Sequence, residues 1–202
     1  MTDVQPGDLY PDLAVRPARA SDRAAIEAIA VQVWDGHDYL PQRFTAWLAE
    51  AEGLFCVATV RDRVVGTAKL SRLSPAFWWM EGLRVDPAFR RQGVAQTLQR
   101  YLVRHAHTHC APGTLAFSTA SDNVAVQHLA QETGFALAAS FAPFGAATAP
   151  LPTPGLKPLA ADAAGQAWAF LSGSAYFAAA QRTLEESWRF YPITPKLLRS
   201  RC

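Results

Sequence analysis

The segment at residues 87–96, PAFRRQGVAQ, combines positive charge and backbone freedom at one point of the chain. Arg90 and Arg91 come shortly before Gly93, and apolar residues at helical spacing begin at Val94. The first turn of a helix has unpaired backbone N–H groups and the positive end of the helix dipole, so it attracts anions. A glycine lets an anion's oxygen approach the backbone closely. The segment therefore predicts a pyrophosphate-sized anion site, although a helix that merely begins with surface arginines fits the same pattern.

The elements that must position this segment follow from the spacing of apolar residues. Strands are expected at residues 13–16, 54–60, 64–73, 76–85, 114–120 and 135–144. One helix is expected after Ser21 as its N-cap, with Ile26, Ile29 and Val33 on its core face, and others after Pro41 and over 94–109 and 123–133. This order predicts an α/β fold in which the anion segment joins a strand to a helix.

Composition restricts the class of protein. The chain has 202 residues, of which 50% are hydrophobic, so it is expected to fold around a core. Its formal net charge of +2 is spread along the chain without a basic tract, which argues against a nucleic-acid partner. An N-terminus without a signal-peptide layout and the lack of a long apolar run predict a cytoplasmic protein with no membrane partner.

Cysteine and histidine patterns give no metal site. The three cysteines are too scattered for a disulfide framework or a thiolate zinc site. His105 and His109 lie one helical turn apart, but Cys110 is the only further ligand type close by. Histidines in the last turn of a helix also complement its dipole, so we predict no metal.

Three segments are expected along the chain: a domain at 1–141 that contains the anion segment, a linker rich in Pro, Ala and Gly at 142–158, and an extension at 159–202. The extension contains several aromatic residues, which predicts that it packs on the domain or on a partner subunit. A homodimer is therefore one of the assemblies left open.

Two motifs resemble the GNAT superfamily of N-acetyltransferases. RRQGVA matches that superfamily's Arg/Gln-x-x-Gly-x-Gly/Ala turn, and it follows a strand that ends in LRVDP. NVAVQHLAQETGF is similar to its Asn-x-x-Ala-x-x-Leu-Tyr-x-x-x-Gly-Phe segment. The resemblance covers residues 13 to about 141. It implies a mixed, mostly antiparallel sheet with helices on both faces, splayed between the strands at 77–85 and 115–119 to admit acetyl-CoA.

The resemblance also implies which residues hold acetyl-CoA as co-substrate. Backbone amides from Gln92 to Ala95, through Gly93 and Val94, would bind the pyrophosphate, with Arg90 and Arg91 adding charge. The strand residues Leu83, Arg84 and Val85 would hydrogen-bond the pantetheine arm. Asn123 would face the cofactor.

Glu81 is the candidate general base. It lies in FWWMEGL on the strand that leads to the anion segment, where apolar neighbours would raise a carboxyl pKa. A salt bridge to Arg84 is the structural alternative. Where many members of the superfamily carry the tyrosine that protonates the leaving thiolate, this chain has Ala130. His128, Tyr101, Tyr39 or solvent would then take that role.

The acceptor side is predicted at WDGHDYLPQRFTAWL, between the first two helices. His37, Asp38 and Tyr39 are the candidate substrate-binding residues, with Asp38 directed to an ammonium and Tyr39 forming a wall; the alternative is a loop in which Asp38 caps the helix and Tyr39 packs. This segment and EGLRVDPAFRRQGVAQTLQR resemble the histidine N-acetyltransferase group of the superfamily.

The sequence thus predicts direct acetyl transfer to the primary amine of a small molecule, plausibly an amino acid such as histidine. Two alternatives stay open. One is acetylation of peptides or proteins, and the other is a module that binds acyl-CoA without turnover, which the alanine at position 130 favours.

Overall fold

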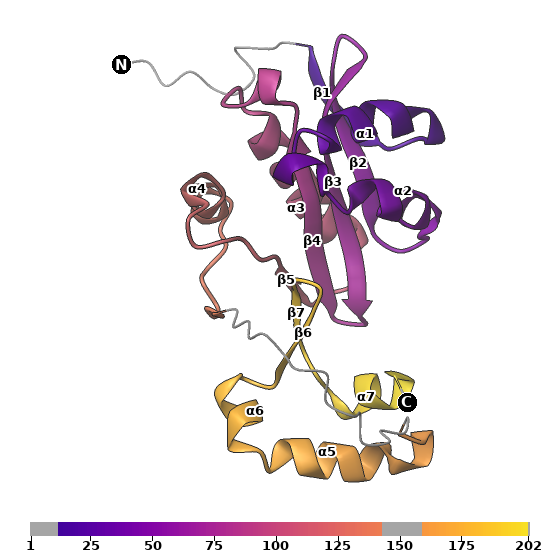
Figure 1. Ribbon diagram of the computed structural model, residues 1–202, viewed down its shortest axis with the longest axis vertical. Coiled ribbons are helices and arrows are strands. Elements are labelled where there is room, and N and C mark those ends of the chain that lie inside the picture. Colours follow the sequence, from indigo (N-terminus) through magenta and orange to yellow (C-terminus); the bar gives the residue numbers. More distant parts are fainter. Residues whose placement is uncertain (1–11, 143–158, 202) are drawn as a thin grey trace. The chain divides into compact units, whose positions relative to one another are not determined.

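The computed structural model describes residues 12–142 and 159–201, which fall into two compact units, Met1–Phe135 and Ala136–Cys202 (Figure 1). Each unit is described by itself below. The predicted linker at 142–158 lies outside the described residues, except for Ala142.

The first unit is built on a five-stranded sheet. In order across the sheet its strands are β1 (Leu13–Pro17), β2 (Leu54–Val60), β3 (Arg63–Ser74), β4 (Phe77–Val85) and β5 (Thr114–Ala116). The first four strands pair antiparallel and β5 joins β4 in parallel, which confirms the predicted mixed, mostly antiparallel sheet. The β2–β3 connection is a tight hairpin in which Arg61 and Asp62 both adopt positive φ.

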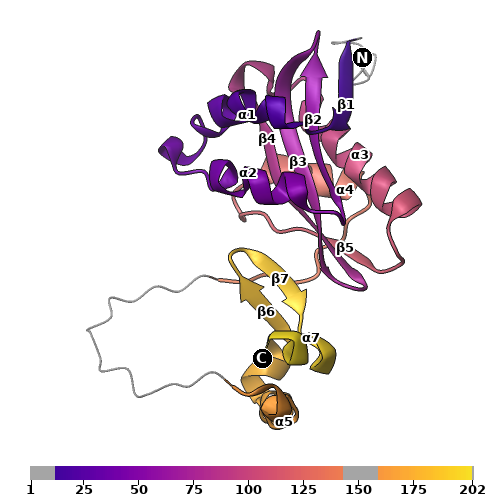
Figure 2. The same ribbon diagram turned by 90° about the vertical axis from the view of Figure 1, so that its right-hand side faces the viewer.

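Three helices of this unit lie against the sheet: α1 (Arg23–Ala30), α2 (Leu40–Ala49) and α3 (Val94–His109) (Figure 2). A further helix, α4 (Val124–Glu132), follows β5, and Gln99 of α3 donates hydrogen bonds to its C-terminal end. Successive residues of a strand face opposite sides of a sheet. Accordingly Cys56 and Ala58 of β2 pack in a core cluster with α3, whereas Phe55 and Val57 pack in another with α1 and α2. Helices on both faces, as predicted, are therefore present.

The parallel pairing of β4 with β5 is short. It extends only from Phe77↔Thr114 to Trp79↔Ala116, whereas β4 continues to Val85. The strand predicted at 114–120 thus has three residues instead of seven. Beyond Trp79 this edge of β4 has no strand beside it in the described sheet, so the predicted splay lies along the part of β4 that leads to the anion segment.

Three other expectations were wrong. Ser21 lies inside a 3-10 turn (Ala20–Asp22), and the N-cap of α1 is Asp22, whose carboxylate accepts hydrogen bonds from Arg16 and from the backbone N–H of Arg19. The helix ends at Ala30, before Val33. Residues 135–142 form no strand, and residues 143 and 144 lie outside the described part.

The second unit contains α5 (Ala164–Ser172), α6 (Ala175–Ala179), a hairpin of β6 (Thr183–Glu186) and β7 (Arg189–Pro192), and α7 (Pro195–Arg201). Tyr191 is 1% exposed and donates a hydrogen bond to Glu186, while Phe177 packs edge-to-face with Trp168. In the residues described, no helix combines the length and apolarity needed to cross a membrane.

Asp22 offers a test of how β1 is joined to α1. Both its carboxylate oxygens accept from Arg16, at 2.7 and 2.8 Å, and Arg16 holds the Asp22 pKa below its ordinary value of 3.8. Asp22→Asn is expected to lower the free energy of unfolding by about 2 kcal/mol at pH 7. A carboxyl with a lowered pKa stabilises the fold above its unfolded pKa and loses that effect as the pH falls further. The difference between wild type and variant should therefore shrink below pH 3.8.

The measurement is denaturant unfolding at pH 7 and at acid pH. Asp12→Asn is the matched control, because its ion pair with Arg61 is largely exposed, and it should change stability by less than about 0.5 kcal/mol. Equal losses in the two variants would contradict this account of Asp22.

Candidate active site

The anion segment folds as a left-handed turn in front of a long helix. After β4, Asp86 accepts from the backbone N–H of Ala88 and begins a 3-10 turn at Pro87–Phe89. Arg91 (φ +57°) and Gly93 (φ +78°) then adopt left-handed backbone, and α3 starts at Val94. Left-handed residues next to helical ones aim successive N–H groups into one concave site, which suits an anion.

The first helical hydrogen bond of α3 runs from the Thr97 N–H to the Gly93 carbonyl, at 2.9 Å. The amides from Gly93 to Gln96 therefore precede the helical ladder, at the positive end of a 16-residue helix. The side chains of Arg90 and Arg91 are exposed, whereas Val94 is buried and anchors the helix in the core. The structure thus brings the predicted residues 90–95 together in one turn, whose geometry suits an anion.

Gln92 has a further place in this turn. Its Nε2 donates to the Ala88 carbonyl at 3.1 Å. Its buried Oε1 has no hydrogen-bond partner among the described residues. The side chain therefore braces the turn from within.

Glu81 lies beside a bulge in β4. The register of β3 with β4 shifts between Thr67↔Arg84 and Lys69↔Glu81, so β4 has one extra residue there. Gly82 in this bulge has φ +64°, and a Cβ on it would lie 2.7 Å from the Trp47 ring. The Glu81 carboxylate is half-buried and accepts a hydrogen bond from Ser71 Oγ at 2.7 Å. A carboxylate held in this way at the splay can act as a general base.

Trp47 of α2 covers this bulge. It is 4% exposed, and its ring packs edge-to-face against Phe55 at 5.4 Å and against Tyr39 at 6.0 Å. Its indole N–H has no hydrogen-bond partner among the described residues. The ring thus joins Tyr39, on the predicted acceptor loop, to Gly82, next to Glu81.

Asp38 and Arg84 form a buried ion pair. Arg84 Nε lies 2.6 Å from Asp38 Oδ2, and Nη2 lies 3.2 Å from Oδ1. The Arg84 side chain is 12% exposed and the Asp38 side chain is 1% exposed. Asp38 also accepts from the backbone N–H of Leu40, at the start of α2. The sequence assigned the Asp38 carboxylate to an acceptor's ammonium, but that carboxylate already pairs with Arg84. The observed contacts are closer to the alternative in which Asp38 caps the helix.

Tyr39 lies between these charged groups. The Arg84 guanidinium is 5.5 Å from the centre of its ring, and 39% of the residue is exposed. Burial raises the pKa of the Tyr39 hydroxyl, and the negative charges of Glu81 and Asp38 add to this while Arg84 opposes it. The phenol therefore keeps its proton at neutral pH. His37 is exposed on the same loop.

Lys69 is a residue that the sequence analysis missed. It is 0% exposed, its Nζ lies 2.5 Å from Glu50 Oε2, and it donates to the Leu70 carbonyl at 2.8 Å. Glu50 is the C-cap of α2, so this pair fastens the end of that helix to β3. A single lysine inside the apolar run VVGTAKLSRL was the available indication, because a lysine is rarely fully buried without a partner.

Asn123 is the N-cap of α4. Its side chain accepts from the Val126 N–H at 3.3 Å. Among the substitutes considered for the absent tyrosine, His128 is 70% exposed and pairs with Glu132, and Tyr101 packs against the core. Tyr39 packs against Trp47, whose ring lies over Gly82, the residue after Glu81.

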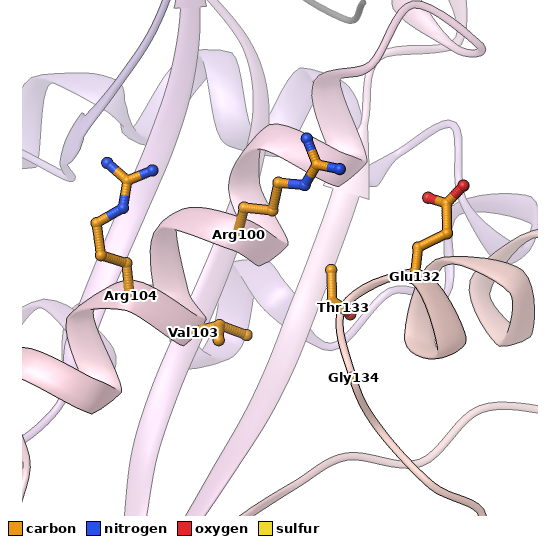
Figure 3. Close-up of a pocket in the computed structure, with 6 residues that line it drawn as sticks. All are labelled: Arg100, Val103, Arg104, Glu132, Thr133 and Gly134. Carbon is orange, nitrogen blue, oxygen red and sulfur yellow. The ribbon is translucent and has the colours of Figure 1, made fainter.

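A separate cavity of about 500 Å³ lies between α3 and the end of α4 (Figure 3). Its lining contains none of the predicted site residues and consists of Arg100, Val103, Arg104, Glu132, Thr133 and Gly134.

Comparison with known sequences gives the family. Residues 22–135 match the Acetyltransferase (GNAT) family. Histidine N-acetyltransferase from Scomber australasicus is 33% identical over 85 residues, which cover 42% of this chain and 25% of that protein. Probable N-acetyltransferase 16 from Homo sapiens is 32% identical over 94 residues, which cover 44% of this chain and 26% of that protein. The chain thus matches about a quarter of the length of these curated relatives.

Solved structures are similar in fold. A putative acetyltransferase from Salmonella typhimurium with its cofactor acetyl-CoA has a TM-score of 0.55 and 22% identity, covering 63% of this chain and 82% of that one. Aminoglycoside N-acetyltransferase AAC(6')-Iy in complex with CoA has a TM-score of 0.54 and 19% identity, covering 66% and 94%.

The bulge at Gly82 can be tested directly. Gly82→Ala is expected to destabilise the protein by about 1–3 kcal/mol, because the methyl group meets the Trp47 ring and the backbone is left-handed. Gly165→Ala is the control, since its Cβ would enter open space in α5, and it should be neutral or stabilising by up to about 1 kcal/mol. Thermal unfolding of both variants is the measurement, and an undisturbed Gly82→Ala protein would show that the bulge tolerates a side chain.

Proposed function

Because the chain belongs to the Acetyltransferase (GNAT) family, we propose that it is an acetyl-CoA-dependent N-acetyltransferase that acts on the primary amine of a small molecule. The observation that carries this proposal is the position of Glu81 on the same strand that leads, past the splay, to the left-handed turn at α3. A base and an anion site are thereby held in one continuous stretch of backbone.

The residues fit acetyl-CoA as co-substrate. Its pyrophosphate suits the amides from Gln92 to Ala95, supported by the left-handed turn and by the charges of Arg90 and Arg91. Leu83, Arg84 and Val85 lie on β4 beyond the last pair with β5, so this edge can accept an extended pantetheine arm.

The reaction needs a neutral amine. Acetyl-CoA supplies a thioester carbonyl, the amine nitrogen bonds to its carbon, and the C–S bond breaks. Glu81, aimed by Ser71, takes the proton that the amine loses. A backbone N–H at Leu83 or Arg84 would polarise the carbonyl oxygen. No covalent enzyme intermediate is involved, and burial raises the pKa of Cys56 to about 12, which makes that thiol a poor nucleophile.

For the acceptor, we propose an amino acid such as histidine. The curated relatives named histidine N-acetyltransferase support this choice, although they match through only part of their length. His37 and Tyr39, on the loop before α2, would contact the acceptor, and Tyr39 would form its wall next to Glu81.

The deciding experiment measures thiol release from acetyl-CoA with free amino acids, polyamines and short peptides. Saturable release with amino acids, histidine included, is expected. Glu81→Gln should lower kcat by at least about 100-fold while acetyl-CoA still binds, because only proton transfer is removed. Glu52→Gln, at an exposed carboxylate, is the control and should retain activity. Acetyl-CoA binding without release for any amine would instead indicate a sensor.

The anion turn is tested by Gly93→Ala. Gly93 has φ +78°, so a Cβ there strains the turn, and loss of one charge-assisted hydrogen bond would weaken acetyl-CoA binding by about tenfold. Gly134→Ala carries the same backbone strain (φ +84°) with open space around its Cβ, so its dissociation constant should stay near wild type. Calorimetric titration measures both, and equal weakening in the two variants would argue against the turn as the pyrophosphate site.

A further inference from the structure

The Asp38–Arg84 ion pair joins two parts of the chain that differ in how firmly they are held. Arg84 belongs to β4, where it pairs with Thr67 of β3. Asp38 belongs to a loop between a 3-10 turn (Trp34–Gly36) and α2, and Asp35 and Gly36 in that turn both have positive φ. The strand is therefore fixed by the sheet, whereas the loop depends on side-chain contacts.

The pair is nearly saturated with hydrogen bonds. Asp38 accepts from two nitrogens of Arg84 and from the Leu40 N–H, and the third Arg84 nitrogen, Nη1, donates to the Leu83 carbonyl at 3.0 Å. Such a buried, forked pair defines one geometry, because a misplaced partner would leave a charge buried and unpaired. The Asp38 carboxylate is thus poorly available to an acceptor's ammonium.

Tyr39 depends on this geometry. The ring has Arg84 at 5.5 Å and Trp47 at 6.0 Å, and Trp47 in turn lies against Gly82, the residue after Glu81. A shift of the loop would therefore move the Tyr39 ring relative to Glu81, while β4 itself would stay in place.

We propose that the Asp38–Arg84 pair is a positioning device that fixes Tyr39 as the acceptor wall beside Glu81. This inference rests on the proposed function for its kinetic consequence. Asp38 and Arg84 act through Tyr39, so their loss should impair use of the amine more than binding of acetyl-CoA.

The first test needs no turnover. Hydrogen exchange is compared in wild type, Asp38→Asn and Arg84→Met, with Arg61→Met, from an exposed ion pair, as control. Faster exchange confined to residues 35–41, including the Leu40 amide, is expected in the two pair variants, with α3 unchanged. Unchanged exchange in that loop would overturn the inference whether or not the protein is an acetyltransferase.

The second test separates positioning from mere stability. Asp38→Asn should raise KM for the amine by at least about tenfold and leave the acetyl-CoA dissociation constant within about threefold. In a Tyr39→Ala background the same substitution should add little, because its effect passes through Tyr39. Arg84→Lys, which keeps the charge, should partly restore the amine KM relative to Arg84→Met. Full additivity of the Asp38 and Tyr39 effects would overturn the inference.

The two tests distinguish failure of the proposed function from failure of the positioning role. A wild-type protein without turnover, but with loop exchange that rises in Asp38→Asn, would refute the proposed function and retain the pair as the device that holds the loop. Turnover with normal KM values in the folded Asp38→Asn variant would retain the function and refute the positioning role.

Discussion

The bulge at Gly82 is the constraint on which the site depends. One extra residue in β4 interrupts its ladder with β3, and a bulge of this kind bends a strand and increases its twist. It places Glu81 next to Gly82, which has positive φ and whose Cβ position would be blocked by the Trp47 ring. On the other edge of β4, pairing with β5 has already ended at Trp79. The same strand segment thus carries a carboxylate, an open edge and, shortly after, the anion turn.

The two faces of the sheet are joined to their helices by different kinds of interaction. On one face α3 packs through buried aliphatic residues, Val94, Leu98 and Leu102, and the interaction is non-directional. On the other face, ion pairs add direction: Arg16–Asp22 ties β1 to the start of α1, Lys69–Glu50 ties β3 to the end of α2, and Arg84–Asp38 ties β4 to the loop between these helices. Buried ion pairs contribute little net stability but restrict geometry. The proposed acceptor wall at Tyr39 would benefit from that restriction.

Local patterns in the sequence predicted much of this fold. The apolar run at 54–60 and the four-residue spacing from Val94 to His109 coincide with β2 and α3, because each depends on residues close in sequence. The prediction of a strand at 135–144 was wrong because a strand also needs a neighbouring strand to pair with, and local apolar content does not reveal one. Leu137 in this segment is 87% exposed. Gly93 and Glu81 could be chosen as site candidates from motif and context. The Asp38–Arg84 pair could not, because its members lie 46 positions apart and each had a reasonable local role.

Ala130 raises the question of which step of the proposed reaction needs help from the protein. Its carbonyl accepts from the Phe135 N–H as part of the end of α4, and its methyl side chain can donate no proton. Tyr39 keeps its proton, since burial raises its pKa, so it can offer a hydrogen bond but is a weak acid. A thiolate, however, is a much better leaving group than an amine, whereas an alkylammonium cannot attack until it is deprotonated. The chemistry therefore places the greater demand on a base, and Glu81, held by Ser71, is the group proposed for that role in a chain that lacks the tyrosine.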